Sequence, residues 1–366
     1  MTNNSEGLSK TDLFELRVRL LRAFWINATM ALTDTVGAKS ALDALRPYFI
    51  HHGKYTASMI RSQQIKFSTP EDIYYGCARS NQMVNHTKVC GELREKGVLY
   101  KAMDCATKGA SSVACICNCR LTIEPALEDL NSEYGILMNQ SLSGGDLLCS
   151  WTIASKGLMH TTDLGDKIAD LEPPPIDAEL FEEFAPAVLG EYWAISTKSF
   201  IEVVGEDRTR EILTERQREF GGESAVGIIS LFGLEEGTKV SPGEAMGFMS
   251  EVFQMMGDGG SADLPLVEKE ISECPFSGSP EEVCYQYEAF LNGLLSKIEP
   301  DCELKYDRMM TKGDKTCHWA IRKCLETKVK ERPGDPLIIL ALRLARGEIS
   351  DEEFEKKKAL LKGAGF

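Results

Sequence analysis

Cysteines are the residues of this chain best suited to chemistry, and three of them recur with one spacing. The spacing is Cys-x9-Cys with a further cysteine 34 or 33 residues later, found at Cys105, Cys115 and Cys149 and again at Cys274, Cys284 and Cys317. A thiolate is both a nucleophile and a soft-metal ligand. The repeated spacing therefore predicts a thiol-centred site in which the sulfurs of each set approach one another.

The last cysteine of each set belongs to a second motif, Gly-Asp-x2-Cys-x-Trp, at residues 145–151 and 313–319. Glycine at the tip is typical of a tight hairpin turn, beyond which Asp146 and Asp314 either bond turn amides or serve a polar site. Side chains two apart on a strand share a face, so each cysteine should lie buried beside its tryptophan. His318 alternates with them and should face the other side, as a surface residue or as a general base.

Metal binding is the alternative use of these thiols, with Cys274, Cys284 and Cys317 as the candidate soft-metal ligands. Neither a Cys-x2-Cys pair nor a Cys/His pair at zinc-knuckle distance occurs, so a structural zinc site has little support. The run Cys115-Ile-Cys117-Asn-Cys119 would converge on one face of a strand but would fan out on a helix. No P-loop, dinucleotide fingerprint or Gly-x-Ser-x-Gly elbow is present, so no other cofactor is predicted.

Both motifs lie in a long internal repeat. The motif at Gly145 returns at Gly313, an offset of 168 residues, and the same offset places Trp25 on Trp193. For the first two cysteines of each set the offset is 169. A shared offset over this length indicates a tandem duplication, in which matched tryptophans and glycines are kept for packing unless they line a site.

The predicted fold is α+β, with two tandem repeats that each place N-terminal helices before an antiparallel sheet or hairpin. Copy one covers residues 11–165 and copy two covers residues 178–328, separated by a Pro-rich extended linker at 166–177. A short helical hairpin at 333–362 ends the chain, and Ser350 with Glu353 forms a capping box in it.

Apolar spacing predicts two helices at the start of each copy, over 11–35 and 38–50 and over 185–204 and 208–220. Four glycines are expected to be helix C-caps: Gly37, Gly205, Gly53 and Gly221. Each Gly-Asp turn is expected to join two strands, over 133–140 and 147–153 in copy one and over 302–309 and 316–321 in copy two.

Composition narrows the range of partners. The net charge of −15 is uneven, since residues 1–172 carry 18 Lys/Arg and 19 Asp/Glu whereas residues 173–366 carry 23 and 37. An acidic second half argues against nucleic acid as a partner. The N-terminus shows no secretory signal and no run of 18 apolar residues occurs, so we expect a cytoplasmic protein that spans no membrane. In that reducing compartment the 12 cysteines should mostly be thiols.

Copy two carries a series of further motifs: Tyr192-Trp193, Gly205, Phe220-Gly221, Glu273-Cys274-Pro275, Cys284, Ile298-Glu299-Pro300 and Gly313-Asp314-x2-Cys317. Together, over most of residues 183–323, they resemble the L-2-amino-thiazoline-4-carboxylic acid hydrolase-like family. Copy one matches this family more loosely, because Ala106 follows Cys105 and Ser132 stands where copy two has Pro300. The cysteine-bearing half also resembles the vinyl-reductase-type small-molecule-binding domain.

The first resemblance implies hydrolytic opening of a cyclic amidine-like ring. If the chain is an enzyme, we expect hydrolysis of a cyclic amidine or amide C–N bond, with Asp314 or His318 as the water-activating base or a thiolate of Cys274 or Cys284 as the nucleophile. Copy one lacks the Cys-Pro step and has Ser150 in place of His318, so its site should be degenerate or structural. The alternative is a non-catalytic sensor that binds a small molecule or a soft metal through the repeated cysteines.

The end of the chain, from Asp335 to Leu361, looks like the short C-terminal helical module that ends many bacterial and archaeal proteins. A helical hairpin of this length cannot bury its own apolar face. It must therefore dock on the body of the protein or on another chain, which predicts a homo-oligomer formed through this module.

Overall fold

The computed structural model describes residues 10–62, 66–85, 89–103, 105, 107, 112–159, 163–173, 178–231, 262–263, 267–272, 274 and 276–323. The chain divides into two compact units, residues 1–321 and residues 322–366. All described residues except 322 and 323 belong to the first unit. The predicted C-terminal hairpin lies outside the described residues. Within the described part, no helix has the length and hydropathy needed to cross a membrane.

Copy one begins with three helices: α1 (Lys10–Val36), α2 (Ala38–Ser62) and α3 (Pro70–Asn85). Strands β1 (Val89–Arg94) and β2 (Gly97–Ala102) lead to a helical segment composed of α4 (Ser112–Cys115), the π-helix η1 (Ile116–Leu121) and α5 (Ile123–Leu130). The remaining elements are β3 (Tyr134–Gln140), the 3-10 turn η2 (Leu142–Gly144), β4 (Cys149–Ser155), the 3-10 turn η3 (Lys156–Leu158) and β5 (Lys167–Leu171).

Copy two repeats this order where it is described. Its elements are α6 (Ala178–Val204), α7 (Glu206–Leu231), β6 (Ala262–Asp263), β7 (Val267–Ile271), α9 (Glu281–Ile298), β8 (Cys302–Arg308), the 3-10 turn η4 (Met310–Lys312) and β9 (Cys317–Lys323). The protein is therefore α+β, as the sequence predicts.

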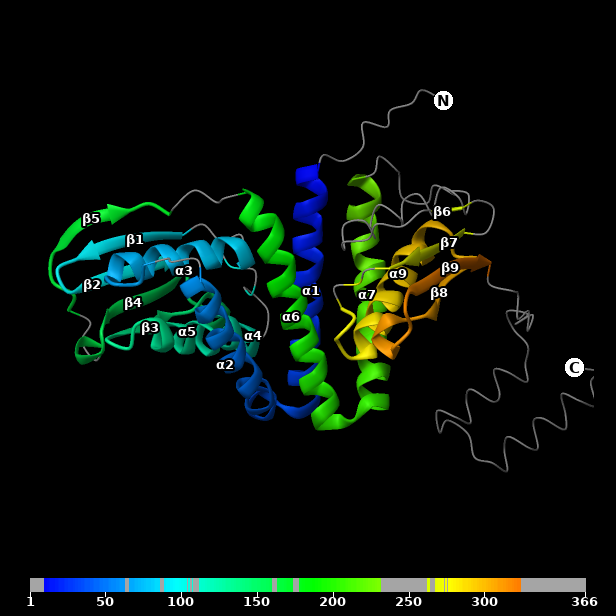
Figure 1. Ribbon diagram of the computed structural model, residues 1–366, viewed down its shortest axis with the longest axis horizontal. Helices are drawn as coiled ribbons and strands as arrows, with labels where there is room; N and C mark the ends of the chain where they lie inside the picture. Colours follow the sequence, from blue (N-terminus) through cyan, green and yellow to red (C-terminus); the bar gives the residue numbers. More distant parts are fainter. Residues whose placement is uncertain are drawn as a thin grey trace, which may run out of the picture. The chain divides into compact units, whose positions relative to one another are not determined.

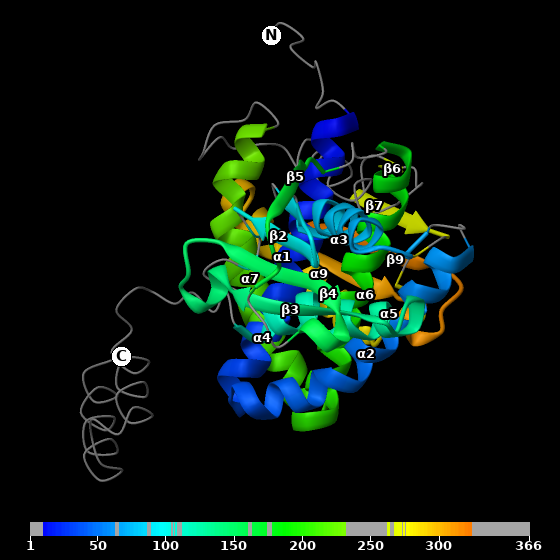
Figure 2. The same ribbon diagram turned by 90° about the vertical axis from the view of Figure 1, so that its left-hand side faces the viewer.

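Each copy forms one sheet, whose strands can be followed in Figures 1 and 2. The strand order is β3-β4-β2-β1-β5 in copy one and β8-β9-β7-β6 in copy two. Elements matched by the repeat offset occupy the same places, and β5 is an additional edge strand of copy one. The register agrees as well, since Ala102 lies opposite Cys149 in the antiparallel pair β2–β4, as Ile271 lies opposite Cys317 in β7–β9. The two orders agree over the matched strands, and the duplication itself stays a prediction.

The predicted linker at 166–177 is wrong over its first part. Residues 167–171 form β5, which pairs antiparallel with β1. The Leu171 side chain is buried in the core beside this sheet. The prolines begin only at Pro173, where the lack of a backbone N–H ends the ladder. The prolines therefore follow the end of β5. The linker predicted from their composition began too early and included the residues of this strand.

Two pairs of matched glycines shape the first two helices of each copy: one pair lies between the helices and the other lies inside the second helix. Gly37 and Gly205 adopt φ values of 81° and 86° between successive helices, as expected of C-caps. Gly53 and Gly221, predicted as C-caps, instead lie inside α2 and α7, which run on to Ser62 and Leu231. A Cβ built on Gly53 would stand 3.1 Å from the Thr122 carbonyl carbon, and one on Gly221 would stand 2.9 Å from that of Phe290. Both glycines thus allow one helix to cross closely over another, at the same offset of 168.

Helices α1 and α6 lie side by side and share one hydrophobic core (Figure 1). The Phe24 ring stacks on Trp193 at 4.6 Å, and Tyr192 packs edge-on against Trp25 at 5.5 Å. Because Phe24 matches Tyr192 and Trp25 matches Trp193, each contact is the counterpart of the other. Such reciprocity is the property of a two-fold interface, here formed within one chain.

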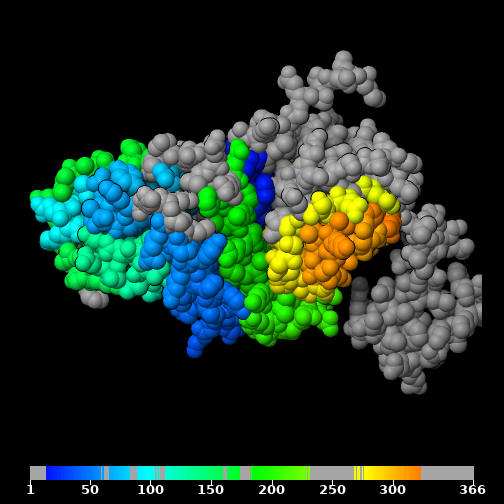
Figure 3. Space-filling model, in the orientation of Figure 1, coloured from blue at the N-terminus to red at the C-terminus, as the bar shows by residue number. Residues whose placement is uncertain are grey.

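Polar contacts at the edge of this core obey the same relation. Arg216 donates to Asp34 at 2.9 Å, and the Tyr48 hydroxyl donates to Glu202. Tyr48 matches Arg216 and Asp34 matches Glu202 at the offset of 168. On the face shown in Figure 3, the blue surface of α2 borders the green surface of α6 across this interface.

Candidate thiol site

The Gly-Asp-x2-Cys motif builds the same turn in both copies. Gly145 and Gly313 take φ values of 97° and 92°, which a glycine adopts without strain. The carboxylate of Asp146 accepts the Ser141 amide at 2.7 Å, and that of Asp314 accepts the Met309 amide at 2.8 Å. The aspartates therefore hold the turn, which is the structural role of the two that the sequence allows.

The cysteine of each motif faces inward from this turn. The Cys149 sulfur accepts the Leu142 amide at 3.1 Å, and the Cys317 sulfur accepts the Met310 amide at 3.2 Å. Both cysteines are buried, as are the tryptophans two residues further along each strand. The expectation that each cysteine lies on a strand face with its tryptophan is confirmed.

In copy two the structure brings the three matched thiols together. Cys274 precedes a turn that leads into α9, and its thiol is hydrogen-bonded to that of Cys317. Cys284, in the first turn of α9, lies near both and is 3.2 Å from the Thr311 hydroxyl. This is the turn and helix start that the spacing predicts.

The two predicted nucleophiles of copy two, Cys274 and Cys284, are nevertheless unsuited to attack a substrate at neutral pH. The hydrogen bond to Cys317 and burial raise the pKa of Cys274, and burial raises the pKa of Cys284 to about 11. The Phe276 ring, two residues after Cys274, lies edge-on to Trp193 at 5.3 Å. Both predicted nucleophiles therefore stay protonated near neutral pH.

The two predicted bases do not join this cluster. His318 lies on the sheet face opposite to Cys317, where its ring nitrogens are 3.2 Å from Asp307 and 3.5 Å from Glu268. Asp314 is exposed at the turn and its carboxylate is engaged by the backbone. His318 thus pairs with Asp307 and Glu268, and Asp314 bonds the Met309 amide, so these contacts do not direct either base toward the thiols.

In copy one a fourth thiol joins the cluster. Cys115, Cys119 and Cys149 are buried in one hydrophobic core, against which the partly exposed Cys105 packs. Cys115 and Cys119 are hydrogen-bonded to each other from successive turns of the segment α4–η1. The run of alternating cysteines is helical, so its side chains fan out and Cys117 enters the other core, next to α1 and α6.

Hydroxyl groups surround the sulfur of Cys115. The Ser141 hydroxyl lies 3.5 Å from it, and the hydroxyls of Ser143 and Thr107 also hydrogen-bond to this sulfur. The hydrogen bond from Cys119 is the largest cause that lowers the pKa of Cys115 to about 6, and these hydroxyls lower it further against the opposing effect of burial. The same thiol pair, together with burial, raises the pKa of Cys119. Three hydroxyls on one side of the pair are the physical reason to assign the thiolate to Cys115.

The other two thiols of this cluster, Cys105 and Cys149, stay protonated. Burial raises the pKa of Cys149 to about 11, and burial raises that of Cys105 although the Thr107 hydroxyl at 3.1 Å opposes it. The buried guanidinium of Arg22 on α1 acts on Cys105 in the same opposing direction. The lowered thiol pKa therefore lies in copy one, which the sequence predicts to be degenerate.

A one-residue insertion lies at this thiol pair. Cys115 matches Cys284 at an offset of 169, whereas Thr122 and Phe290, which face the matched glycines Gly53 and Gly221, are 168 apart. Copy one thus holds one more residue between these points than copy two, and the π-helix η1 accommodates it where α9 is continuous. The Thr122 hydroxyl donates to the Cys117 carbonyl at 3.0 Å and satisfies a backbone group of this irregular turn.

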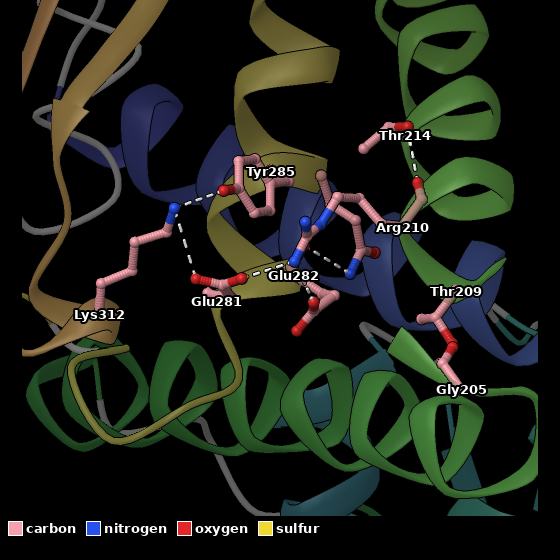
Figure 4. A network of polar contacts seen from close by, with 9 residues as sticks. Gly205, Thr209, Arg210, Thr214, Glu281, Glu282, Tyr285 and Lys312 are labelled. Atoms are coloured by element: carbon pink, nitrogen blue, oxygen red, sulfur yellow. Dashed lines mark hydrogen bonds and ion pairs between the residues drawn. The ribbon is translucent and has the colours of Figure 1, made fainter. Parts of the chain in front are cut away.

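Copy two has a polar network at the matching place (Figure 4). Arg210 on α7 donates to Glu281 at 2.5 Å and to Glu282 at 2.8 Å, and its guanidinium lies 4.4 Å from the ring centre of Tyr285. Lys312 on η4 donates to the Tyr285 hydroxyl at 2.5 Å. Pairing with Arg210 compensates the burial of the Glu282 carboxylate, which is 2% exposed. The network ties α7 and η4 to the start of α9.

Copy one cannot form this network, because Leu42, Val113 and Ile116 match Arg210, Glu282 and Tyr285. Apolar residues therefore stand at the start of the helix that carries Cys115, at the positions where copy two has these charged and polar groups. Among the described residues, no group of three or more His, Cys, Asp or Glu side chains is arranged to hold a metal ion. That finding includes the candidate set Cys274, Cys284 and Cys317.

Sequence reasoning found the matched cysteines and missed the groups that act on them. Thr107, Ser141 and Ser143 lie on two loops, and nothing in their spacing marks them as neighbours of Cys115. The extra residue did leave a signal, since the last interval of the cysteine spacing is 34 in copy one and 33 in copy two.

Comparison with known proteins identifies the end of the chain. The family model of the short C-terminal domain, SHOCT, matches residues 335–361. The short C-terminal module predicted at 333–362 is thereby shown, and the predicted helical hairpin there lies outside the described residues. The searches of curated proteins and of solved structures returned no match. The resemblance to the thiazoline hydrolase-like family receives no support from these comparisons.

Proposed function

We propose that this protein is a small-molecule sensor in which the Cys115 thiolate of copy one is the responding group. The observation that carries the proposal is the ring of hydrogen-bonding groups around one sulfur: the Cys119 thiol and the hydroxyls of Thr107, Ser141 and Ser143, of which the two serines also bond each other. A thiolate is the reactive form of cysteine, so the class of ligand is a small electrophile or oxidant that reacts with sulfur. Copy two, in which Cys274 and Cys284 are protonated and the start of α9 is held by Arg210, serves as the scaffold.

Hydrolysis of a cyclic amidine or amide C–N bond is the second candidate, and it too depends on Cys115. A thiolate with hydroxyl donors around it can attack an amidine carbon and stabilise the charge that develops there. The nucleophile of the expected hydrolase would then be Cys115 and not Cys274 or Cys284. A base that activates water would still be required, because His318 and Asp314 point elsewhere.

The proposed chemistry also favours a reducing compartment such as the cytoplasm, where Cys115 would remain a thiolate until its ligand arrives. None of the eleven cysteines in the described residues forms a disulfide. We also propose that the protein forms a homo-oligomer through the short C-terminal domain at residues 335–361.

One experiment separates the two candidates. The protein is incubated with a mild electrophile and, separately, with a cyclic amidine, while thiol loss and ring opening are followed. A sensor loses about one thiol equivalent to the electrophile and opens no ring; a hydrolase turns over the amidine. Either activity should vanish in Cys115→Ser and persist in Cys284→Ser, the matched variant of copy two. Equal thiol loss in Cys115→Ser and wild type would contradict the proposal.

A further inference from the structure

The thiol pair of Cys115 and Cys119 stands out within the copy-one cluster. The two residues are one helical turn apart across α4 and η1, and their thiols are hydrogen-bonded. Cys119 is buried, and the Asn118 amide is 3.8 Å from its sulfur. The remaining thiols are engaged elsewhere: Cys149 accepts the Leu142 amide, and Cys105 bonds the Thr107 hydroxyl.

We infer that a hydroperoxide-class oxidant converts this pair into a reversible disulfide, with Cys115 as the attacking thiolate and Cys119 as the resolving thiol. The inference rests on the proposed function, because it requires Cys115 to be the responding group, and it names the ligand class and the product. It adds a modification site within the fold, at a position where copy two has Glu288 four residues after Cys284 and so cannot form the bond.

The reaction balances in two steps. The Cys115 sulfur attacks the terminal peroxide oxygen and the O–O bond breaks; the departing alkoxide takes a proton from water and leaves as an alcohol, with Cys115 as a sulfenic acid. The Cys119 thiol then gives up its proton, its sulfur attacks the Cys115 sulfur, and the S–O bond breaks to release water. Two thiols lose two electrons in total, and the peroxide gains them.

The local backbone favours this pair over other pairs. Side chains four apart on a helix have Cβ atoms about 5–6 Å apart, whereas a disulfide needs about 3.5–4.5 Å. Closing the difference requires a small backbone change. The π-helix η1 accommodates the one-residue insertion of copy one; Cys119 lies inside it and Cys115 directly precedes it. Such an irregular turn commonly marks a functional site. Copy one therefore carries both the second thiol and the irregular turn, and copy two carries neither.

A chain of contacts links this turn to copy two. The Thr122 hydroxyl bonds the Cys117 carbonyl at 3.0 Å, and the Tyr192 hydroxyl of α6 donates to Thr122 at 3.4 Å. The Tyr192 ring packs against Trp25 at 5.5 Å and against His52 at 5.0 Å. A change of η1 on disulfide formation would thus reach the interface between the copies, where Trp25 reports it by fluorescence.

The test treats the full-length wild-type protein with a stoichiometric amount of cumene hydroperoxide, blocks remaining thiols and maps disulfides by mass spectrometry. We expect one cross-link, between Cys115 and Cys119, that dithiothreitol removes. The cross-link should persist in Cys105→Ser and disappear in Cys119→Ser, where Cys115 should proceed to the sulfinic acid. Trp25 fluorescence, isolated in a background in which Trp151, Trp193 and Trp319 are each changed to Phe, should change on oxidation of the Cys115–Cys119 pair and not in Cys119→Ser.

The outcomes separate the two proposals. Oxidised Cys115 paired with Cys105 or Cys149 in the wild type, or passing directly to the sulfinic acid, would overturn the role of Cys119 and leave the proposed function standing. A wild type in which Cys115 remains a thiol while other cysteines are oxidised would overturn both. Because these readings come from the wild type, they hold even if a variant fails to fold.

Discussion

The two thiol clusters stand on the same turn and the same strand register, and they differ in what surrounds the sulfurs. In copy one, hydroxyls of Thr107 and Ser141 face Cys115, and at the matching positions copy two has Phe276 and Met309. Hydroxyls stabilise a thiolate by donating hydrogen bonds, whereas a ring and a thioether cannot. The comparison teaches that a backbone shared by two copies fixes where the sulfurs lie and leaves their chemistry to a few neighbours.

The helices that carry Cys115 and Cys284 also differ, in regularity and in the contacts that hold their first turns. Copy two pins the start of α9 with the network of Arg210, Glu282 and Lys312, and its helix is regular. Copy one has apolar residues there, and its helix contains the π-helix η1. A duplicated fold can assign rigidity to one copy and a reactive, irregular turn to the other, since each copy stabilises its partner through the shared core.

The largest expected effect concerns the feature that the copies share, the helix crossing. Gly53→Ala and Gly221→Ala should each destabilise the protein by about 3 kcal/mol, because the new methyl group would overlap a backbone carbonyl that cannot move aside. The measurement is urea unfolding. Gly227→Ala is the matched control, since nothing lies within 4 Å of its added Cβ, and it should stabilise α7 by up to about 1 kcal/mol. Equal effects at all three glycines would refute the close crossing.

The next effect concerns the network that only copy two has. Arg210→Met should lower the free energy of unfolding by about 2–3 kcal/mol, because it leaves the Glu282 carboxylate buried without its cation. Arg208→Met is the control, since its pair with Glu211 is exposed and should contribute under about 0.5 kcal/mol. Chemical unfolding of both variants decides the point. A harmless Arg210→Met would mean that copy two is not held by these charges.

The smallest effect concerns the matched tryptophans. The Trp193 indole N–H donates to the buried amide of Gln286 at 2.8 Å, whereas the Trp25 indole N–H has no hydrogen-bond partner because Cys117 replaces that glutamine. Trp193→Phe should therefore cost about 1 kcal/mol more than Trp25→Phe, the price of one buried hydrogen bond. Thermal or urea unfolding of the two variants measures the difference. A larger loss at Trp25 would reverse this part of the comparison.

How much of this could be predicted from sequence depends on whether the signal is local. The Gly-Asp turn and the inward cysteine after it were predictable, because a glycine at positive φ and a carboxylate that bonds turn amides act within seven residues. The repeat predicted that both copies share one strand order, but it did not predict which order. Gly53 and Gly221 were misassigned because a C-cap glycine and a helix-crossing glycine look the same when the crossing partner, about 70 residues away, is unknown.

The chemistry of the site was less predictable for the same reason. His318 and the Cys274-Pro275 step occur in copy two and not in copy one. Their presence suggested that copy two is the active copy. What decides the thiol pKa is the set of hydroxyls brought to Cys115 by tertiary structure, and Ser and Thr carry no signal of their own in a sequence. The spacing difference of one residue between the copies was visible, but only the helix geometry shows that it produces a π-helix at the thiol pair.

The central claim is that Cys115 of copy one is a thiolate whereas Cys284, its match in copy two, stays protonated. A pH titration of the ultraviolet thiolate absorbance, taken as the difference between wild type and Cys115→Ser, tests it without any requirement for reagent access. The account predicts that one thiolate equivalent appears as pH rises through about 6, because deprotonation is favoured by the donors around this sulfur. The matched difference with Cys284→Ser should show no thiolate until the pH approaches about 11. A Cys115 midpoint at or above the ordinary cysteine value of about 8.5 would contradict the account.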